Sequence, residues 1–275
     1  PSVVPDVAIR ADARSFLDEL ICEMRGEPLN TGDWVAAIHR WRDAYPVDVA
    51  EYEDESDGMN SYHFTRLLSE RMPDDAVFVL DTGSCFHVHA QAFKVKFGQR
   101  HIITGGLSTM GFMPGVMGAA AANGRDVYCV TGDGSLQMNL QELATIAHYD
   151  LPAKLIVFNN AGYLLIRLTQ GNFLEGRLIG ESEATGVGFP DLERVAMTYG
   201  IHFVRITGET DFDRGVADLI EHSGPVICEV ITPSSQLLVP RVSSRQLEDG
   251  TMVSMPYDDM FPFLPRDEYE SNQIK

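Results

Sequence analysis

The sequence is short of basic residues, of cysteine and of long apolar runs, and each shortage excludes a class of protein. Its 275 residues carry 21 lysines and arginines against 40 aspartates and glutamates, which gives a formal net charge of −19. This balance disfavours nucleic acid and anionic membranes as partners, because both repel a negatively charged surface. The longest apolar runs are only as long as a strand, so we expect no transmembrane helix. Residues 1–10 also lack the basic region and apolar stretch of a secretory signal.

Cysteine is rare, and its positions do not suggest a metal site or a disulfide framework. Cys22, Cys85, Cys129 and Cys228 form neither a CxxC motif nor the Cys/His spacing of metal ligands. Cys129 and Cys228 lie in apolar segments, where a reduced thiol packs as a small core residue. We therefore expect a reducing compartment and a cytoplasmic location.

The sequence is rich in apolar segments of strand length that alternate with helical patterns. Hydrophobic residues make up 44% of the chain, which is typical of a globular protein. Such an alternation predicts an α/β fold, with a doubly wound six-stranded parallel sheet flanked by helices. The expected strands are residues 76–80, 100–104, 127–131, 154–158, 202–206 and 226–231.

Composition divides the chain into three parts. Residues 1–58 predict two short helices and an acidic linker. Residues 59–232 contain all six expected strands and begin with a helix that Asn60 is suited to cap. Residues 233–275 form a tail rich in proline, serine and acids.

Two polar motifs follow two of the expected strands. Asp133 lies in Gly-Asp-Gly-Ser after residues 126–131, and Asn160 ends Phe-Asn-Asn after residues 153–158, 27 positions later. A helical stretch at 138–148 separates them, so the strands are parallel and both motifs emerge at the carboxyl edge of the sheet, where open α/β sheets bind ligands. A carboxylate and an amide oxygen suit Mg²⁺.

A phosphate site is expected beside this cation. Gly134 and Ser135 open the next helix, and free backbone N–H groups at a helix start attract anions. The motifs together predict magnesium plus a diphosphate. An ordinary β–α turn is the plain alternative. A dinucleotide fold fits less well, because the glycine-rich turn lacks its third glycine and Asp133 would repel a bare pyrophosphate.

The two motifs resemble the thiamine diphosphate signature, in which Gly-Asp-Gly is followed by Asn-Asn about two dozen residues later. Here 24 residues separate Gly134 from Asn159. The resemblance covers roughly residues 60–265 and is to the C-terminal, diphosphate-binding domain of thiamine-diphosphate-dependent enzymes of the acetolactate synthase-like family. It implies thiamine diphosphate and Mg²⁺ as cofactors, and makes residues 59–232 the diphosphate- and Mg²⁺-binding domain. The implied metal ligands are Asp133, Asn160 and the backbone carbonyl of Gly162, and the implied cofactor contacts near them include Gly132, Tyr163, Leu164 and Leu165.

Two further loops complete the expected cofactor site. Thr82, Gly83 and Ser84 directly follow the first strand, where hydroxyl and N–H groups can hold phosphate oxygens. By resemblance Gly83 and Ser84 approach the diphosphate, whereas a turn without a ligand is the alternative. His87 and His89 lie nearby and are weaker candidates for a general base.

The second loop, residues 105–112, resembles the Gly-Gly-Leu-Gly-Thr-Met-Gly segment of acetolactate synthases. In that family the methionine lies between the two rings of the cofactor and imposes a bent shape. The resemblance gives Met110 this catalytic role, and gives the Ser108 carbonyl the role of accepting a hydrogen bond from the cofactor's amino group. Ser108 replaces a family glycine.

The resemblance also indicates the type of reaction. Pyruvate-decarboxylase-like relatives have a proton-donating glutamate at the position of Ile166, and isoleucine cannot donate a proton. We therefore expect a carboligase that decarboxylates a small 2-oxo acid such as pyruvate and transfers the acyl carbanion equivalent to a ketone or aldehyde. Residues 168–188 are expected to form a long loop that serves as a lid or substrate-binding segment. Arg167 and Arg177 are candidates to meet an acid or phosphate on the acceptor, and two solvated surface arginines are the favoured alternative.

The resemblance suggests that this chain does not act alone. Residues 1–50 resemble the end of the family's middle domain, and the pyrimidine-binding domain with its activating glutamate is missing. Glu142 is a poor substitute. We expect a split enzyme in which a second chain supplies that domain, in a heterotetramer of two chains of each kind. A subunit of a 2-oxo acid decarboxylase, a non-catalytic cofactor-holding subunit, and a fragment of a longer protein are the alternatives.

Overall fold

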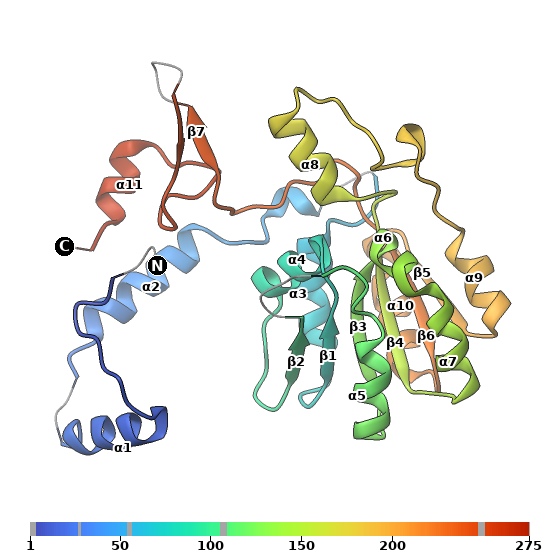
Figure 1. The fold of residues 1–275 in the computed structure, drawn as a ribbon, viewed down its shortest axis with the longest axis horizontal. Helices are drawn as coiled ribbons and strands as arrows, with labels where there is room; N and C mark the ends of the chain where they lie inside the picture. The colour runs from blue at the N-terminus through green and yellow to red at the C-terminus, as the bar shows by residue number, and fades with distance from the viewer. Residues whose placement is uncertain (1–3, 27–28, 54–56, 105–108, 247–250, 275) are drawn as a thin grey trace. The chain divides into compact units, whose positions relative to one another are not determined.

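The chain forms two compact units, residues 1–46 and residues 47–275 (Figure 1). The boundaries expected from composition, 1–58, 59–232 and 233–275, remain a prediction. No helix among the described residues is both long enough and apolar enough to cross a bilayer. The structure is a computed structural model, and it describes residues 4–26, 29–53, 57–104, 109–246 and 251–274.

The first unit contains two helices, α1 (Ala13–Glu23) and α2 (Gly32–Ala44). Asp12 caps α1 by accepting a hydrogen bond from the Ser15 N–H at 3.1 Å. Ala37 is the only buried residue of these helices. Most of their larger apolar side chains, such as Ile21 and Trp34, are exposed.

The second unit is built on a six-stranded sheet in which every pairing is parallel. The order β2-β1-β3-β4-β6-β5 confirms the predicted doubly wound sheet. In the register of the two central strands, Gly132 lies opposite Phe158. The residues that follow these two positions therefore leave the sheet side by side. The strands are β1 (Val77–Leu80), β2 (Arg100–Ile103), β3 (Val127–Gly132), β4 (Ala153–Asn159), β5 (His202–Ile206) and β6 (Val226–Ile231).

Helices cover both faces of the sheet (Figure 1). Side chains alternate along each strand, so Phe78 and Leu80 enter one apolar core while Val77 and Val79 enter the other. The first core is completed by α3 (Ser61–Arg71), α4 (Ser84–Ala92) and α10 (Glu209–Glu221). The second is completed by α5 (Gly115–Asn123), α7 (Leu143–His148) and α9 (Leu192–Tyr199). Asn60 caps α3 as expected, because its side chain accepts from the Tyr62 N–H.

The helix expected at 138–148 is interrupted. A short helix α6 (Asp133–Leu136) follows β3, then a 3₁₀ segment η3 (Gln137–Glu142) precedes α7. Asn139 is the break, with a non-helical φ of −140°. Its side-chain N–H donates to the Gly111 carbonyl at 2.7 Å, so this tertiary hydrogen bond competes with a regular helix.

The long loop expected at 168–188 is partly helical. Helix α8 (Leu164–Phe173) runs through Gly171, and a 3₁₀ turn η4 (Glu183–Thr185) lies further along. The Gln170 side chain both donates to and accepts from the Ile179 backbone, at 3.0 and 2.9 Å. These two hydrogen bonds therefore connect the non-helical part of the segment to α8.

The second unit begins and ends with segments outside the sheet. A 3₁₀ turn η1 (Ala50–Tyr52) precedes α3, and the tail contains the antiparallel pair β7 (Ser244–Gln246) and β8 (Met252–Ser254), followed by α11 (Arg266–Asn272). Arg266 makes a two-pronged ion pair with Asp259 at 2.6 and 2.8 Å. Gln236 connects the start of the tail to α3, since its side-chain oxygen accepts from the Ser61 N–H at 2.8 Å.

Phe64 is expected to be a major contributor to the stability of this unit. Its ring is fully buried and meets Phe158 and Phe212 edge-on at 5.7 and 5.6 Å, which joins α3, β4 and α10. Phe64→Ala should lower the free energy of unfolding by about 3–5 kcal/mol. The fully exposed Phe97 offers a matched control, and Phe97→Ala should change that free energy by less than about 0.5 kcal/mol. Denaturant titration measures both, and equal effects would contradict this packing.

Candidate functional site

One pocket gathers the loops that follow β1, β3 and β4 together with part of the segment that precedes α5. Every residue predicted to contact the cofactor or the metal lines this pocket, apart from Ser108, which lies outside the described residues; the candidates His87, His89, Arg167 and Arg177 do not line it. Cys85 and Ile166 line it as well. The predicted residues in the lining are Thr82, Gly83, Ser84, Met110, Gly132, Asp133, Gly134, Ser135, Asn160, Gly162, Tyr163, Leu164 and Leu165.

Asp133 is the buried carboxylate of the pocket, with 3% of its surface exposed. One oxygen accepts from the Gly134 N–H at 2.8 Å and the other from the Gly162 N–H at 2.9 Å. Burial raises the pKa of Asp133 to about 6, although these two N–H groups act in the opposite direction. The carboxylate thus joins the end of β3 to the loop after β4. The Gly134 N–H was expected to be free for an anion, but it donates to the Asp133 carboxylate instead.

Asn160 contributes an oxygen that lacks a partner. Its Oδ1 is buried and accepts no hydrogen bond from any described residue. The neighbouring Asn159 has a different role, because its side chain donates to Glu229 at 2.6 Å. A buried polar oxygen without a partner requires an explanation. A cation bound by Asn160 and Asp133 supplies one, and a set of oxygen ligands fits Mg²⁺.

Two glycines in the pocket cannot be replaced without collision. A Cβ on Gly162 would lie 2.3 Å from the Glu181 carbonyl oxygen, and the φ of Gly162 is +156°. A Cβ on Gly134 would lie 2.3 Å from the ring of Tyr163. The loop after β4 therefore packs directly against the start of α6, and only glycine permits this approach.

Asp81 fixes the segment that carries Met110. It is fully buried, and its Oδ1 accepts from the Thr82 and Phe112 N–H groups at 2.7 and 2.8 Å. Its Oδ2 accepts from the Thr131 hydroxyl at 2.8 Å. The sequence analysis missed this role, although an aspartate directly after a strand is a recognisable signal.

Ser135 and Asn139 hold the same segment from the other side. The Ser135 hydroxyl accepts from the Gly111 N–H at 2.9 Å, while Asn139 donates to the Gly111 carbonyl at 2.7 Å. Both groups belong to the chain that follows β3. Met110, half-buried in the pocket wall, is thereby connected to the Asp133 motif through its neighbour.

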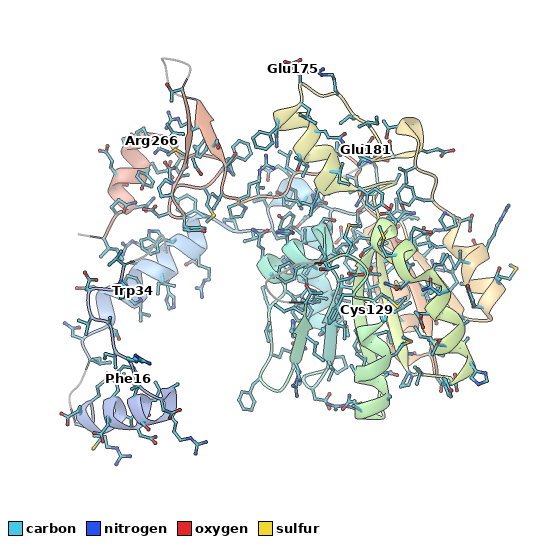
Figure 2. All side chains as sticks on the ribbon, viewed as in Figure 1. Phe16, Trp34, Cys129, Glu175, Glu181 and Arg266 are labelled. Carbon is cyan, nitrogen blue, oxygen red and sulfur yellow. The ribbon has the colours of Figure 1, made fainter. Side chains whose placement is uncertain are left out.

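Arg167 stabilises the loop that contains Asn160. Its guanidinium pairs with Glu181 at 2.6 Å and donates to the carbonyls of Asn160 and Ser234 at 3.4 and 2.6 Å. Glu181, which lies beyond α8 (Figure 2), is 2% exposed, and its own carbonyl accepts from the Tyr163 N–H at 2.8 Å. Burial opposes ionisation of Glu181, yet hydrogen bonds from Ser182 and Arg167 keep its pKa below the usual value.

These contacts contradict the hypothesis that Arg167 meets an acid on the acceptor. Its donors are directed to the protein's own carbonyls and to Glu181. Arg177 is highly exposed and pairs with Glu175 at 3.3 Å. Neither arginine lines the pocket.

The other reactive side chains near the pocket are not placed for acid–base chemistry. His89 is buried among the rings of Phe78, Phe93 and His101, and burial lowers its pKa, which keeps it neutral. His87 is exposed, and its Nδ1 lies 2.8 Å from the Gly83 carbonyl oxygen. Burial raises the pKa of Cys85, whose thiol donates to the Asp81 carbonyl. We assign none of these three a chemical role.

Comparison with known proteins gives one family. The family model described as "Thiamine pyrophosphate enzyme, C-terminal TPP binding domain" matches residues 81–230, which include all the loops of the pocket. The acetolactate synthase large subunit of Cyanidium caldarium is 32% identical over 247 residues, covering 87% of this chain and 41% of that protein. The acetolactate synthase isozyme 1 large subunit of Escherichia coli (strain K12) is 30% identical over 240 residues, covering 86% and 41%. The chain thus spans about two fifths of the length of these relatives.

The raised pKa of Asp133 predicts that Mg²⁺ binding weakens in mild acid. The carboxyl is ionised above a pKa of about 6 and takes up a proton below it, so the cation must then displace that proton. Below pH 6 the apparent affinity should fall by up to about tenfold per pH unit. Calorimetric titration of Mg²⁺ at saturating thiamine diphosphate between pH 5 and 8 measures this.

Asp133→Asn separates this effect from protonation of the diphosphate itself. The variant should bind weakly at every pH and retain only the pH dependence of the ligand. If the Mg²⁺ affinity of the wild type and of Asp133→Asn changed with pH in the same way, the role of Asp133 would be contradicted.

Proposed function

The chain belongs to the thiamine pyrophosphate enzyme family as a C-terminal TPP binding domain, and we propose that it forms the diphosphate- and Mg²⁺-binding half of an acetolactate synthase-like active site. One observation carries this proposal above the others. A buried carboxylate with a raised pKa and a buried amide oxygen without a partner line the same pocket, and one cation satisfies both.

In this proposal Asp133, the Asn160 Oδ1 and the Gly162 carbonyl hold Mg²⁺. A bound Mg²⁺ would offset the negative charge of a diphosphate, and backbone and hydroxyl groups of Gly83 and Ser84, which line the same pocket, would hold its oxygens. Because the Gly134 N–H donates to Asp133, that N–H supports the metal ligand instead of the anion.

Met110 and Ser108 are proposed to orient the cofactor. The Met110 thioether is a soft, adaptable group suited to separate two rings, and the Ser108 carbonyl is suited to accept from an amino group. The hydrogen bonds of Asp81, Ser135 and Asn139 to residues 111–112 support Met110 in this role, since they fix the backbone next to it. A backbone fixed before the ligand binds lowers the entropy cost of ordering this segment.

The chemistry follows from what the bound cofactor and the pocket wall each supply. Thiamine diphosphate, when bound, supplies the electron sink that allows a 2-oxo acid such as pyruvate to lose its carboxylate. Leu164, Leu165 and Ile166 line the pocket with apolar surface. Ile166 has no proton to donate, so the pocket favours carbon–carbon bond formation with a ketone or aldehyde acceptor over release of a free aldehyde.

The other half of the site is proposed to come from outside residues 1–275. The pyrimidine-binding domain and its activating glutamate are not found within these residues. Glu142 lies in η3, where it accepts a hydrogen bond from Thr145 at 3.1 Å, and it does not line the pocket. A second chain carrying that domain, in an assembly of two chains of each kind, is the arrangement we propose; the same domain on a longer polypeptide would complete the site equally well.

The proposal predicts that residues 1–275 alone show no turnover of pyruvate. Carbon dioxide release and ligation product should appear when the complementary domain is added, identified by copurification and mass spectrometry. In the assembled enzyme Asp133→Ala should abolish Mg²⁺-dependent cofactor binding while circular dichroism shows an intact fold. Robust turnover by the isolated chain would refute the need for a second domain, and unchanged cofactor affinity of Asp133→Ala would refute the site.

Ile166 is expected to control the choice between ligation and aldehyde release. In the assembled enzyme, Ile166→Glu introduces a proton donor and should raise the ratio of aldehyde to ligation product by roughly tenfold or more. Glutamine is similar to glutamate in size and polarity, but its amide is not an acid. Ile166→Gln should therefore leave the ratio of aldehyde to ligation product near that of the wild type. Equal ratios in the two variants would exclude this role, and aldehyde as the main wild-type product would favour a 2-oxo acid decarboxylase.

A further inference from the structure

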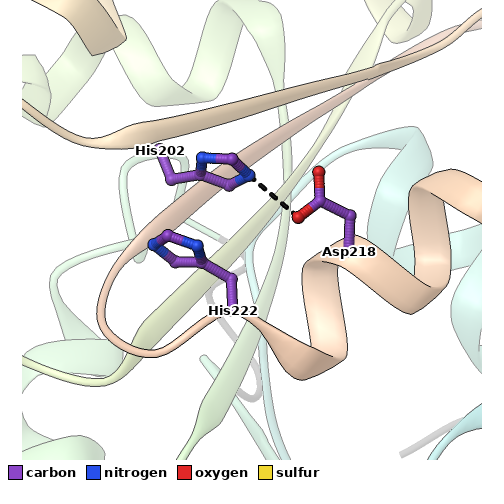
Figure 3. Close-up of side chains that lie close together, drawn as sticks. All are labelled: His202, Asp218 and His222. Carbon is purple, nitrogen blue, oxygen red and sulfur yellow. Dashed lines mark hydrogen bonds and ion pairs between the residues drawn. The ribbon is translucent and has the colours of Figure 1, made fainter.

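Three side chains with metal-binding chemistry lie together at the edge of the sheet opposite the cofactor pocket (Figure 3). His202 is the first residue of β5, whereas Asp133 follows the last residue of β3. Because these strands are parallel, the two residues lie at opposite edges of the sheet. Asp218 lies in the last turn of α10, and His222 follows that helix. One ligand atom from each residue falls within 4.8 Å of the others.

The backbone holds these residues close to one another. Asp218 and His222 are four residues apart, and the His222 N–H donates to the Asp218 carbonyl at 3.1 Å, which continues the helical spacing. Residues spaced in this way share one face of a helix. The His202 Nε2 lies 3.0 Å from the Asp218 Oδ1, and the two imidazole rings stack at 4.0 Å with an angle of 7° between their planes.

The charges around the cluster include two carboxylates that attract a cation and one lysine that opposes it. The carbonyl end of a helix is negative, and the last turn of α10 contains no basic residue to offset Asp218. A second carboxylate, that of Asp150, lies beside the cluster, because a Cβ on Gly224 would come within 3.0 Å of its oxygen. The buried Lys154 is a nearby positive charge that opposes a cation, although Asp126 lies 3.9 Å from its Nζ and offsets part of that charge.

We propose that His202, Asp218 and His222 bind a divalent transition-metal ion of the zinc class. Two imidazoles and one carboxylate are a donor set that suits Zn²⁺ and Co²⁺ better than Mg²⁺ or Ca²⁺, which prefer oxygen. Metal–ligand bonds of about 2.0–2.2 Å place neighbouring donor atoms about 3–4 Å apart. The His202–Asp218 distance already meets this range, and His222 reaches it when the stacked rings tilt. His202 and Asp218 have exposed fractions of 33% and 46%, so the cluster has room for that movement.

The bound ion would connect two elements of the fold. β5 is an outermost strand of the sheet, paired only with β6 among the described strands. The ion would join the start of β5 to the end of α10, at the turn that leads into β6. Ions that bind only the folded state raise its stability, so this site would stabilise the edge of the sheet and leave the cofactor pocket unaltered.

Tag-free protein and Co²⁺ or Zn²⁺ alone test the proposal. We expect one Co²⁺ per chain at this site, with the visible absorption of nitrogen and oxygen coordination, and a rise in melting temperature with Zn²⁺. His202→Gln and His222→Gln should weaken binding by roughly tenfold or more and remove the temperature rise. His148→Gln, at an exposed histidine on α7, should change neither.

Two further variants identify the site if the histidine changes impair folding. Asp218→Asn keeps a side chain able to bond His202 but loses the carboxylate, so it should retain the melting temperature of the metal-free wild type and bind the ion more weakly. Asp133→Ala should retain the spectrum and the temperature rise, which separates this site from the cofactor pocket. Binding that survives in His202→Gln, His222→Gln and Asp218→Asn, or binding that is lost in Asp133→Ala, would overturn the proposal.

Discussion

The burial of the Asp133 carboxylate is the constraint on which the site depends. A carboxylate removed from water is unstable unless hydrogen bonds or a cation compensate for the lost hydration. Two backbone N–H groups compensate in part, and the pKa of about 6 shows that the protonated form is still favoured relative to free aspartate. The nearby Asn160 Oδ1 accepts no hydrogen bond from any residue that the structure describes. Both groups are less stable without a cation, which is typical of sites where stability is given up for function.

The surrounding structure holds these groups at the edge of the sheet. The register of β3 and β4 places the two motifs side by side. Glycine at position 134 is required by the approach of the Tyr163 ring, and glycine at position 162 by the approach of the Glu181 backbone. Buried charged residues fix the loops around them. Asp81 fixes the segment after Met110, and the pair of Arg167 and Glu181 fixes the backbone at Asn160. The pocket is therefore shaped by hydrogen bonds of Asp81, Asp133, Arg167 and Glu181, whereas the Asn160 Oδ1 accepts none from the described residues.

The sequence predicted the sheet and the grouping of the Asp133 and Asn160 motifs in one pocket, because both depend on local patterns. Strand-length apolar runs and the spacing of Asp133 and Asn160 are visible without long-range information, and the pocket brings together the described residues that were named from them. The kink at Asn139 and the contacts of Arg167 with the loop of Asn160 could not be predicted in this way. Each depends on a partner far along the chain, Gly111 for Asn139 and Ser234 for Arg167. The cluster at His202 was missed for the same reason, because His202 lies in β5, far in the sequence from Asp218 and His222 at the end of α10.

The decisive measurement is the position of a scattering divalent ion in crystals of the chain, grown with Mn²⁺ in place of Mg²⁺ and with thiamine diphosphate. An anomalous difference peak within bonding distance of one Asp133 oxygen and the Asn160 Oδ1 is the result expected here. A cofactor bound with its metal ion elsewhere, and with the Asn160 oxygen still lacking a partner, would contradict the assignment of this pocket.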